Sequence, residues 1–283
     1  ISAIFRGLKI LLWPWKRWPD MSLELYSEQE LAHTLDTLFE RLTRHKAIND
    51  SPRAVLLGGQ SGAGKTGLHR IKRKEFGKNI IIIDGDSYRG EHPRYDQLQD
   101  LHGKDCVNYT KAFAGACVEG IINKLSQAHY NLIIEGTLRT SDVPMKTAQQ
   151  LLSKGYQVEF ALMVTKPELS YLSTLIRYEE MYSLNPDMAR ATPKDHHDGI
   201  VANLCQNMQA LADSGIFYKI SLYNRQMEEI QVEQANAISQ ILEEHLLGTW
   251  SPFEKENYRD SLKRFENLCL LNGHMDTYVW YRE

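Results

Sequence analysis

The stretch Ala54-Val-Leu-Leu-Gly-Gly-Gln-Ser-Gly-Ala-Gly-Lys-Thr66 decides the fold of this chain. Its apolar start is typical of a buried strand. The strand runs directly into Gly59-Gln-Ser-Gly-Ala-Gly-Lys-Thr66, which fits the pattern G-x-x-x-x-G-K-[ST], and a helix-compatible segment follows. A glycine-rich turn without a ligand is the alternative, and the full pattern directly after a strand disfavours it. The sequence therefore predicts a phosphate-binding loop.

Each part of this loop meets one need of a bound nucleoside triphosphate. The glycines let backbone N–H groups turn toward phosphate oxygens, and the following helix presents the positive end of its dipole. Lys65 reaches the β- and γ-phosphates, and Thr66 supplies a hydroxyl ligand for Mg²⁺. The predicted nucleotide-binding residues are Gly59, Gln60, Ser61, Gly62, Ala63, Gly64, Lys65 and Thr66. The expected cofactors are ATP or GTP, with Mg²⁺.

Strand-like and helix-like segments alternate along the rest of the chain. Apolar runs predict strands at residues 54–57, 79–83, 130–134, 158–164 and 218–223. Capping signals and Pro or Gly boundaries predict helices that start near residues 27, 66, 109, 144, 167, 193, 232 and 252. This order predicts an α/β fold, a P-loop NTPase or kinase-like parallel sheet with helices on both faces, whose ligands gather beyond the carboxyl ends of the strands.

Composition narrows the class of protein further. The 283 residues include 33 Lys and Arg against 36 Asp and Glu, a net charge of −3, so no general attraction to nucleic acid is expected. The four cysteines are widely spaced, which predicts neither a disulfide framework nor a zinc site. No apolar run has the roughly 18 residues of a membrane span. We expect a cytoplasmic protein without a transmembrane segment.

The chain is predicted to have one main domain with two appendages. Residues 1–20 form a basic, tryptophan-rich N-terminal extension, residues 21–250 the P-loop kinase domain, and residues 251–283 a C-terminal helix and tail. For the extension we favour packing on the domain or regulation over contact with a membrane surface or a disordered lead. Because the chain opens on Ile1 rather than Met, sequence upstream of it is an open question.

Acidic residues follow two of the predicted strands. Asp84 and Asp86 flank Gly85, and if the strand continues through them their side chains face the same way. An Asp within hydrogen-bond reach of an acceptor hydroxyl can orient it and take its proton, and Asp86 is the candidate base. The alternative is an acidic turn. Glu135 ends the next strand, where an acid would hold Mg²⁺ directly or through water, or else contact the substrate.

Further cations are needed beside Lys65 to balance a triphosphate. Arg177 and Arg190 bracket a segment able to close over the loop, and such arginines stabilise charge on the transferred group in the transition state. Taken singly, each is more often a solvated surface residue. The histidines, including His69, His92, His196 and His197, match no metal-ligand spacing, and we interpret them as structural or surface residues.

Several stretches together resemble the zeta-toxin family of bacterial toxin–antitoxin systems. They are Leu56-Leu-Gly-Gly-Gln-Ser-Gly-Ala-Gly-Lys-Thr66, Ile83-Asp-Gly-Asp-Ser-Tyr-Arg89, Ile134-Glu-Gly-Thr-Leu-Arg139, Thr165-Lys-Pro-Glu168 and Ala189-Arg-Ala-Thr-Pro193. The resemblance covers residues 26–248. It implies a P-loop kinase that phosphorylates the 3′-hydroxyl of the amino sugar in UDP-N-acetylglucosamine and so starves cell-wall synthesis.

The resemblance also implies roles for single residues. The catalytic residues would be Lys65 in the loop, Asp86 as the base, and Arg177 and Arg190 on the transferred phosphate. The residues that contact the sugar nucleotide or order the site would be Asp86, Glu119, Glu135, Thr137 and Thr147. The expected metal ligands, Thr66 and Glu135, come from the analysis of the residues themselves. Gly67 departs from the family, in which a second hydroxyl residue is common after Thr66. The resemblance does not extend to residues 1–20 or past about Trp250.

The sequence also leaves two alternative functions open and predicts a restraint on the kinase. A P-loop kinase of another small hydroxyl compound, or of a nucleic-acid 5′ end, would share fold and phosphate chemistry. A nucleotide-gated binding protein would need no base on the acceptor side, and Asp86 with the two arginines argues against it. The resemblance implies an antitoxin that restrains the kinase in trans, and the tethered N-terminal extension is a candidate restraint in cis.

Overall fold

The structure is a computed structural model that describes residues 23–186, 189–232 and 237–282. The predicted extension of residues 1–20 lies outside the described residues. Within the described part, no helix is long and apolar enough to cross a membrane.

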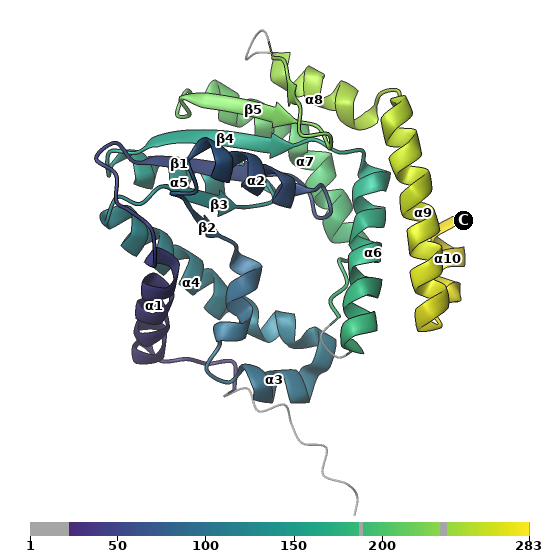
Figure 1. Cartoon of the computed structure of the whole chain (residues 1–283), viewed down its shortest axis with the longest axis horizontal. Coiled ribbons are helices and arrows are strands. Elements are labelled where there is room, and N and C mark those ends of the chain that lie inside the picture. The colour runs from purple at the N-terminus through teal and green to yellow at the C-terminus, as the bar shows by residue number, and fades with distance from the viewer. Residues whose placement is uncertain (1–22, 187–188, 233–236, 283) are drawn as a thin grey trace, which may run out of the picture.

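A six-stranded sheet forms the centre of the fold (Figure 1). Its order is β2-β3-β1-β4-β5-β6, and only β6 is antiparallel to its neighbour. The strands are β1 (Arg53–Gly58), β2 (Ile81–Ile83), β3 (Leu132–Glu135), β4 (Gln157–Met163), β5 (Lys219–Tyr223) and β6 (Glu229–Ile230). The α/β class and the parallel core predicted from the sequence are confirmed.

The register of the parallel strands places the phosphate-binding loop between the ends of β3 and β4. In β1, Leu57 pairs with Glu135 of β3 on one side and with Ala161 of β4 on the other. Because parallel strands finish at the same edge, the loop that leaves β1 emerges beside Glu135 and beside the end of β4. The phosphate-binding loop and Glu135 therefore meet at the carboxyl edge of the sheet.

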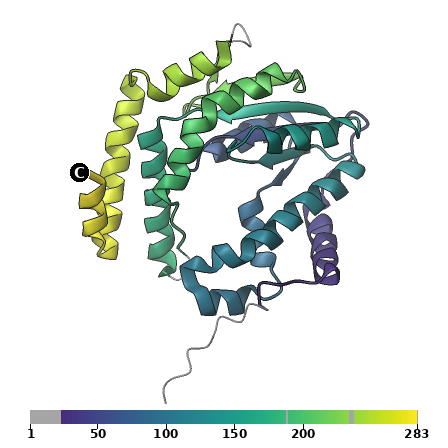
Figure 2. The same ribbon diagram turned by 180° about the vertical axis from the view of Figure 1, so that it is seen from behind.

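Helices cover both faces of the sheet (Figure 2). Helix α2 packs on one face, while α4, α5, α7 and α8 pack on the other, and α1 packs on α4. Their bounds are α1 (Glu28–Thr43), α2 (Lys65–Glu75), α3 (Tyr95–His102), α4 (Cys106–Gln127), α5 (Asp142–Leu152), α6 (Pro167–Leu184), α7 (Lys194–Asp213) and α8 (Ile238–Leu247). Strands buried on both faces explain the unalternating apolar runs in the sequence.

Helix α6 stands beyond the carboxyl edge of the sheet, with the C-terminal segment along its outer side (Figure 1). Helix α9 (Pro252–Asn272) packs on α6, and α10 (Met275–Arg282) returns against α9. Leu172 and Ile176 of α6 meet Leu262, Phe265 and Cys269 of α9 in a separate apolar cluster. The C-terminal segment therefore supports the helix that carries Arg177.

Local sequence signals fixed several helix ends. Ser27 and Glu30 form the predicted capping box of α1, and Ser251 and Glu254 form that of α9. Gly273, with φ 76°, ends α9 in a left-handed conformation that glycine adopts readily.

Other expectations about the elements were wrong. Strand β2 ends at Ile83, and Gly85–Glu91 form the 3₁₀ helix η1, so the strand does not continue through Asp84 and Asp86. Asp84 caps this helix by accepting a hydrogen bond from the backbone N–H of Asp86. Helix α3, the 3₁₀ helix η2 (Gly103–Asp105) and strand β6 were not predicted, since each is short and held mainly by its neighbours.

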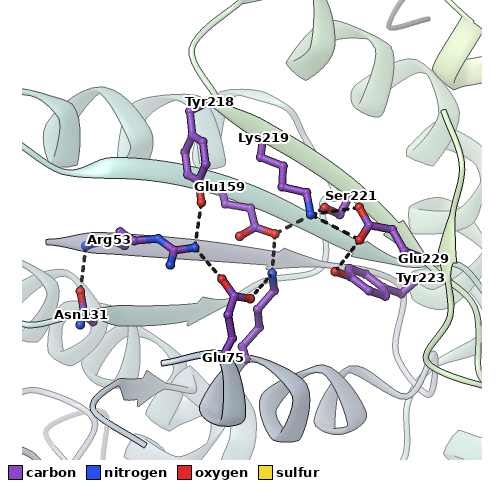
Figure 3. A network of polar contacts seen from close by, with 10 residues as sticks. Arg53, Glu75, Asn131, Glu159, Tyr218, Lys219, Ser221, Tyr223 and Glu229 are labelled. Carbon is purple, nitrogen blue, oxygen red and sulfur yellow. Dashed lines mark hydrogen bonds and ion pairs between the residues drawn. The ribbon is translucent and has the colours of Figure 1, made fainter. Parts of the chain in front are cut away.

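A buried ion pair joins α2 to the sheet (Figure 3). Lys72 Nζ lies 2.5 Å from Glu159 Oε1 of β4 and 3.1 Å from Glu75 Oε2. Both Lys72 and Glu159 are about 1% exposed. Burial lowers the pKa of Lys72, but its hydrogen bonds and opposite charges outweigh that effect, and the pKa is raised overall. Since α2 begins in the phosphate-binding loop, the pair fixes the helix behind the loop.

We predict that Glu159→Gln destabilises the protein by about 3 kcal/mol, because it leaves the buried Lys72 ammonium with only the exposed Glu75 as a counter-charge. Asp36→Asn, which removes an exposed ion pair with Lys124, is the control and should cost less than about 1 kcal/mol. Urea unfolding measures both. Similar losses in the two variants would contradict a special role for the buried pair.

Candidate functional site

The loop after β1 has a backbone that favours glycine at three positions. Gly59, Gly62 and Gly64 have φ values of 131°, 74° and 102°. A Cβ atom at Gly62 would lie 2.0 Å from the carbonyl oxygen of Ser170 in α6. The pattern of glycines in the motif is therefore required by backbone conformation and by close packing.

Hydrogen bonds hold the loop onto the start of α6. Thr165 Oγ1 donates to the carbonyl of Ala63 at 2.8 Å, and Gln60 Nε2 donates to the carbonyl of Thr165 at 2.7 Å. Gln60 Nε2 also lies 3.2 Å from Ser170 Oγ. Gln60, Thr165 and Ser170 are all buried, so these bonds form away from solvent.

The same network continues into α7. Ser170 Oγ lies 2.8 Å from His197 Nε2, and His197 Nδ1 lies 3.0 Å from Asp198 Oδ1. His197 is fully buried, which agrees with its interpretation as structural. It ties the loop and α6 to the helix that follows the segment of Arg190.

Lys65 folds back over the loop. Its Nζ donates to the carbonyl oxygens of Gly59 at 2.8 Å and Gln60 at 3.3 Å, and lies 3.8 Å from Glu135 Oε1. Burial lowers the pKa of Lys65, Glu135 opposes the shift, and the charge of Arg177 adds to it. The ammonium of this part-buried lysine is 3.8 Å from its nearest carboxylate, and it can bind a further anion such as a phosphate.

Glu135 lies between the loop and α2. Its Oε2 is 2.9 Å from His69 Nε2, a close polar contact that is not aligned as a hydrogen bond. Burial raises the pKa of Glu135, but His69 and Lys65 together lower it below the ordinary value. His69, interpreted from sequence as structural or surface, therefore belongs to the site. Its position four residues after Lys65, on the same side of the helix, was the signal that could have revealed it.

The two aspartates after β2 have different surroundings. Asp84 is half-buried, and burial together with the charge of Glu135 raises its pKa. Asp86 is exposed, and its Oδ1 accepts from Arg89 Nε at 2.9 Å. Both contribute to the electrostatic field at Lys65. Asp86 is thus the more accessible carboxylate, and its role as the base stays a prediction.

The two predicted arginines lie on different sides of the site. Arg177 affects the pKa of Lys65 and donates to Thr192 Oγ1 at 3.3 Å. Arg190 lies near α3 and α4, where its charge acts on Tyr95 and Cys106. The structure therefore places Arg177 near Lys65 of the phosphate-binding loop, and Arg190 near α3 and α4.

A cavity of about 220 Å³ opens beside Glu135. Thr137 and Thr147 line it together with Glu135, and Thr147 donates to the carbonyl of Val143 at 3.0 Å. Glu119 is exposed on α4 and does not line this cavity. Three of the residues expected at the sugar nucleotide thus share one hollow at the β3 side of the loop.

The residues present fit a magnesium ion bound together with a nucleotide. The described part of the chain has no cluster of three or more His, Cys, Asp or Glu side chains that would bind an ion without further ligands. Mg²⁺ is commonly held by one or two protein oxygens plus phosphates. Thr66 is exposed at the start of α2, and Glu135 is a carboxylate nearby. This donor set, completed by phosphate oxygens and water, suits Mg²⁺.

The parallel sheet and the loop at the start of α2 define a P-loop protein of the α/β class. Comparison with known protein families agrees with this class. The "Zeta toxin" family profile matches residues 36–235. This chain belongs to the zeta toxin family, which confirms the resemblance seen in its motifs.

Known relatives support this membership over most of the chain. Toxin PezT of Streptococcus pneumoniae is 54% identical over 250 residues, which cover 88% of this chain and 99% of that toxin. Toxin zeta of Streptococcus pyogenes is 37% identical over 259 residues, 89% of this chain and 88% of the toxin. A solved structure from the PezAT chromosomal toxin–antitoxin system of Streptococcus pneumoniae superposes with a TM-score of 0.81 at 50% identity, covering 87% and 99% of the two chains.

We predict that Gly62→Ala weakens nucleotide binding at least tenfold and lowers the melting temperature, since the loop cannot keep both its backbone conformation and its contact with Ser170. Gly199→Ala in α7 is the matched control, because a Cβ there meets nothing within 4 Å. Calorimetric titration and thermal unfolding measure the two effects. Normal nucleotide affinity in the Gly62 variant would contradict the prediction.

Proposed function

We propose that this protein transfers the γ-phosphate of ATP or GTP to the 3′-hydroxyl of the amino sugar in UDP-N-acetylglucosamine. The observation that carries the proposal is the position of Glu135, between Lys65 of the phosphate-binding loop and the cavity lined by Thr137 and Thr147. The phosphate donor and the sugar nucleotide that accepts the phosphate would meet at the Glu135 carboxylate. Family membership supplies the expected chemistry.

The donor side is built from the loop and its cations. Backbone N–H groups at the start of α2 would hold the phosphates, with Lys65 on the β- and γ-phosphates. Bound Mg²⁺, held by Thr66 and Glu135, would neutralise phosphate charge. Arg177 and Arg190 would stabilise the charge that develops on the transferred group.

The acceptor side would use Asp86 as the general base. Its carboxylate would take the proton from the sugar hydroxyl as that oxygen bonds to the γ-phosphorus, while the bond from phosphorus to the β–γ bridging oxygen breaks and leaves a nucleoside diphosphate. Arg89 holds Oδ1 of Asp86 and so orients the carboxylate. Glu119, Glu135, Thr137 and Thr147 would contact the sugar nucleotide or order the site.

The biological consequence would be that of a cytoplasmic toxin against cell-wall synthesis. A product phosphorylated at the 3′-position would block further use of the sugar nucleotide. A relative is part of a toxin–antitoxin system, so we propose that an antitoxin restrains this kinase in trans. Restraint in cis by residues 1–20 is part of the same proposal.

The proposal is tested by incubating the purified protein with Mg-ATP and UDP-N-acetylglucosamine and analysing the product by mass. We expect one added phosphate on the sugar nucleotide, at the amino-sugar ring. Parallel reactions with other small hydroxyl compounds and with nucleic-acid 5′ ends test the other acceptor classes. Nucleotide turnover that is indifferent to UDP-N-acetylglucosamine would overturn the proposed substrate.

We predict that Asp86→Asn lowers the rate of transfer by about 10²-fold or more while nucleotide affinity stays near normal, because only the proton acceptor is lost. Asp100→Asn, an exposed change in α3, is the control. Steady-state kinetics and a separate binding titration distinguish the two effects. Transfer within about tenfold of the wild-type rate would remove Asp86 as the base.

A further inference from the structure

The loop between β5 and β6 reaches the phosphate-binding loop from the side opposite Glu135. Its turn is closed by a hydrogen bond from the backbone N–H of Met227 to the carbonyl of Asn224 at 2.9 Å. The side chains of Asn224 and Glu228 reinforce it: Asn224 Oδ1 accepts from the Glu228 N–H at 3.0 Å, and Asn224 Nδ2 donates to Glu228 Oε2 at 2.9 Å. The turn therefore holds Arg225 in a fixed place.

Met227 docks this turn against the first turn of α2. A Cβ atom at Gly67 would lie 2.0 Å from Met227 Cε and 2.6 Å from Met227 Sδ, so a side chain there would have to displace the methionine. This contact gives a structural reason for the glycine that departs from the family pattern. The β5–β6 turn and the start of α2 consequently form one packed unit.

Arg225 lies within this unit and has no counter-charge among the described residues. Its Nη1 and Nη2 are both 3.1 Å from Ser173 Oγ in α6, and that hydroxyl itself donates to the carbonyl of Leu169. Among the described residues, no carboxylate forms an ion pair with Arg225, and burial alone lowers its pKa. A guanidinium has five N–H donors, so most of its capacity is left for another acceptor.

The position of Arg225 indicates what that acceptor is. Its Nε lies 3.8 Å from where a Cβ at Gly64 would stand, and Gly64 is the N-cap of α2. The N-terminus of this helix is the predicted phosphate site. A cavity of about 260 Å³ borders Arg225, Asn224 and Thr165, and no residue of the phosphate-binding loop lines it, so protein does not enclose the guanidinium on all sides.

We propose that Arg225 is a nucleotide-binding residue that contacts the phosphates of the donor from the β5 side. This inference rests on the proposed function, because it takes the donor to be a nucleoside triphosphate. The planar guanidinium exchanges its hydroxyl partner for phosphate oxygens, which it binds more strongly as charge-assisted, two-pronged hydrogen bonds. Lys65 and Arg225 then flank the triphosphate from opposite sides of β1.

The test measures binding of a non-hydrolysable ATP analogue and of inorganic tripolyphosphate, with Mg²⁺ and without sugar nucleotide, by calorimetry on the full chain. Arg225→Ala is expected to weaken both ligands by about tenfold or more, and Arg225→Lys by less, since the charge remains. Arg259→Ala, an exposed arginine of α9, is the control and should bind both ligands normally. Arg225→Gln keeps most of the packing and replaces the alanine variant if that variant does not fold.

Three results would overturn the inference, and the third would also overturn the proposed function. If Arg225→Ala and Arg225→Gln bind both ligands within about threefold of wild type, Arg225 does not contact the donor. If only the ATP analogue is weakened, Arg225 contacts the nucleoside and not the phosphates. If the wild-type chain binds neither ligand, the nucleotide donor itself fails, and the proposed function fails with it.

Discussion

The close approach of Gly62 to the carbonyl of Ser170 is the constraint on which the site depends. It places the phosphate-binding loop directly on α6, where one additional carbon atom would not fit. The buried bonds of Gln60 and Thr165 then fix the loop in that position. Because backbone donors are useful for catalysis only when they are held before the ligand arrives, this packing converts a flexible glycine-rich sequence into a preorganised site.

Helix α6 is in turn held from its outer side. Glu179, about 1% exposed, accepts from Asn272 Nδ2 at 2.7 Å and lies 2.9 Å from His274 Nδ1, both at the junction of α9 and α10. Glu179 is two residues from Arg177. Helices α9 and α10 therefore hold α6, whose inner side faces the phosphate-binding loop. The loop, Arg177 and the C-terminal segment are connected through α6.

The charged side chains of the site are separated by sign, and this arrangement suits the proposed ligands. Carboxylates gather on the β2 and β3 side, where the charge of Glu135 contributes to the raised pKa of Asp84. Guanidinium and ammonium groups lie at the loop and toward β5, where burial lowers the pKa of Lys65 and of Arg225. A polyanion bound on the cationic side would offset the desolvation cost of the buried cations. A cation or hydroxyl bound on the acidic side would offset the desolvation cost of the buried carboxylates.

The sequence by itself determined the elements whose signals are local. The strand, the glycine loop and the start of α2 follow from one contiguous motif, and Ser27 and Ser251 fixed helix starts through bonds to residues three positions away. Tertiary structure alone decided that His69 meets Glu135 and that Arg225 reaches Gly64, because those pairs are brought together by the order of strands and not by spacing along the chain.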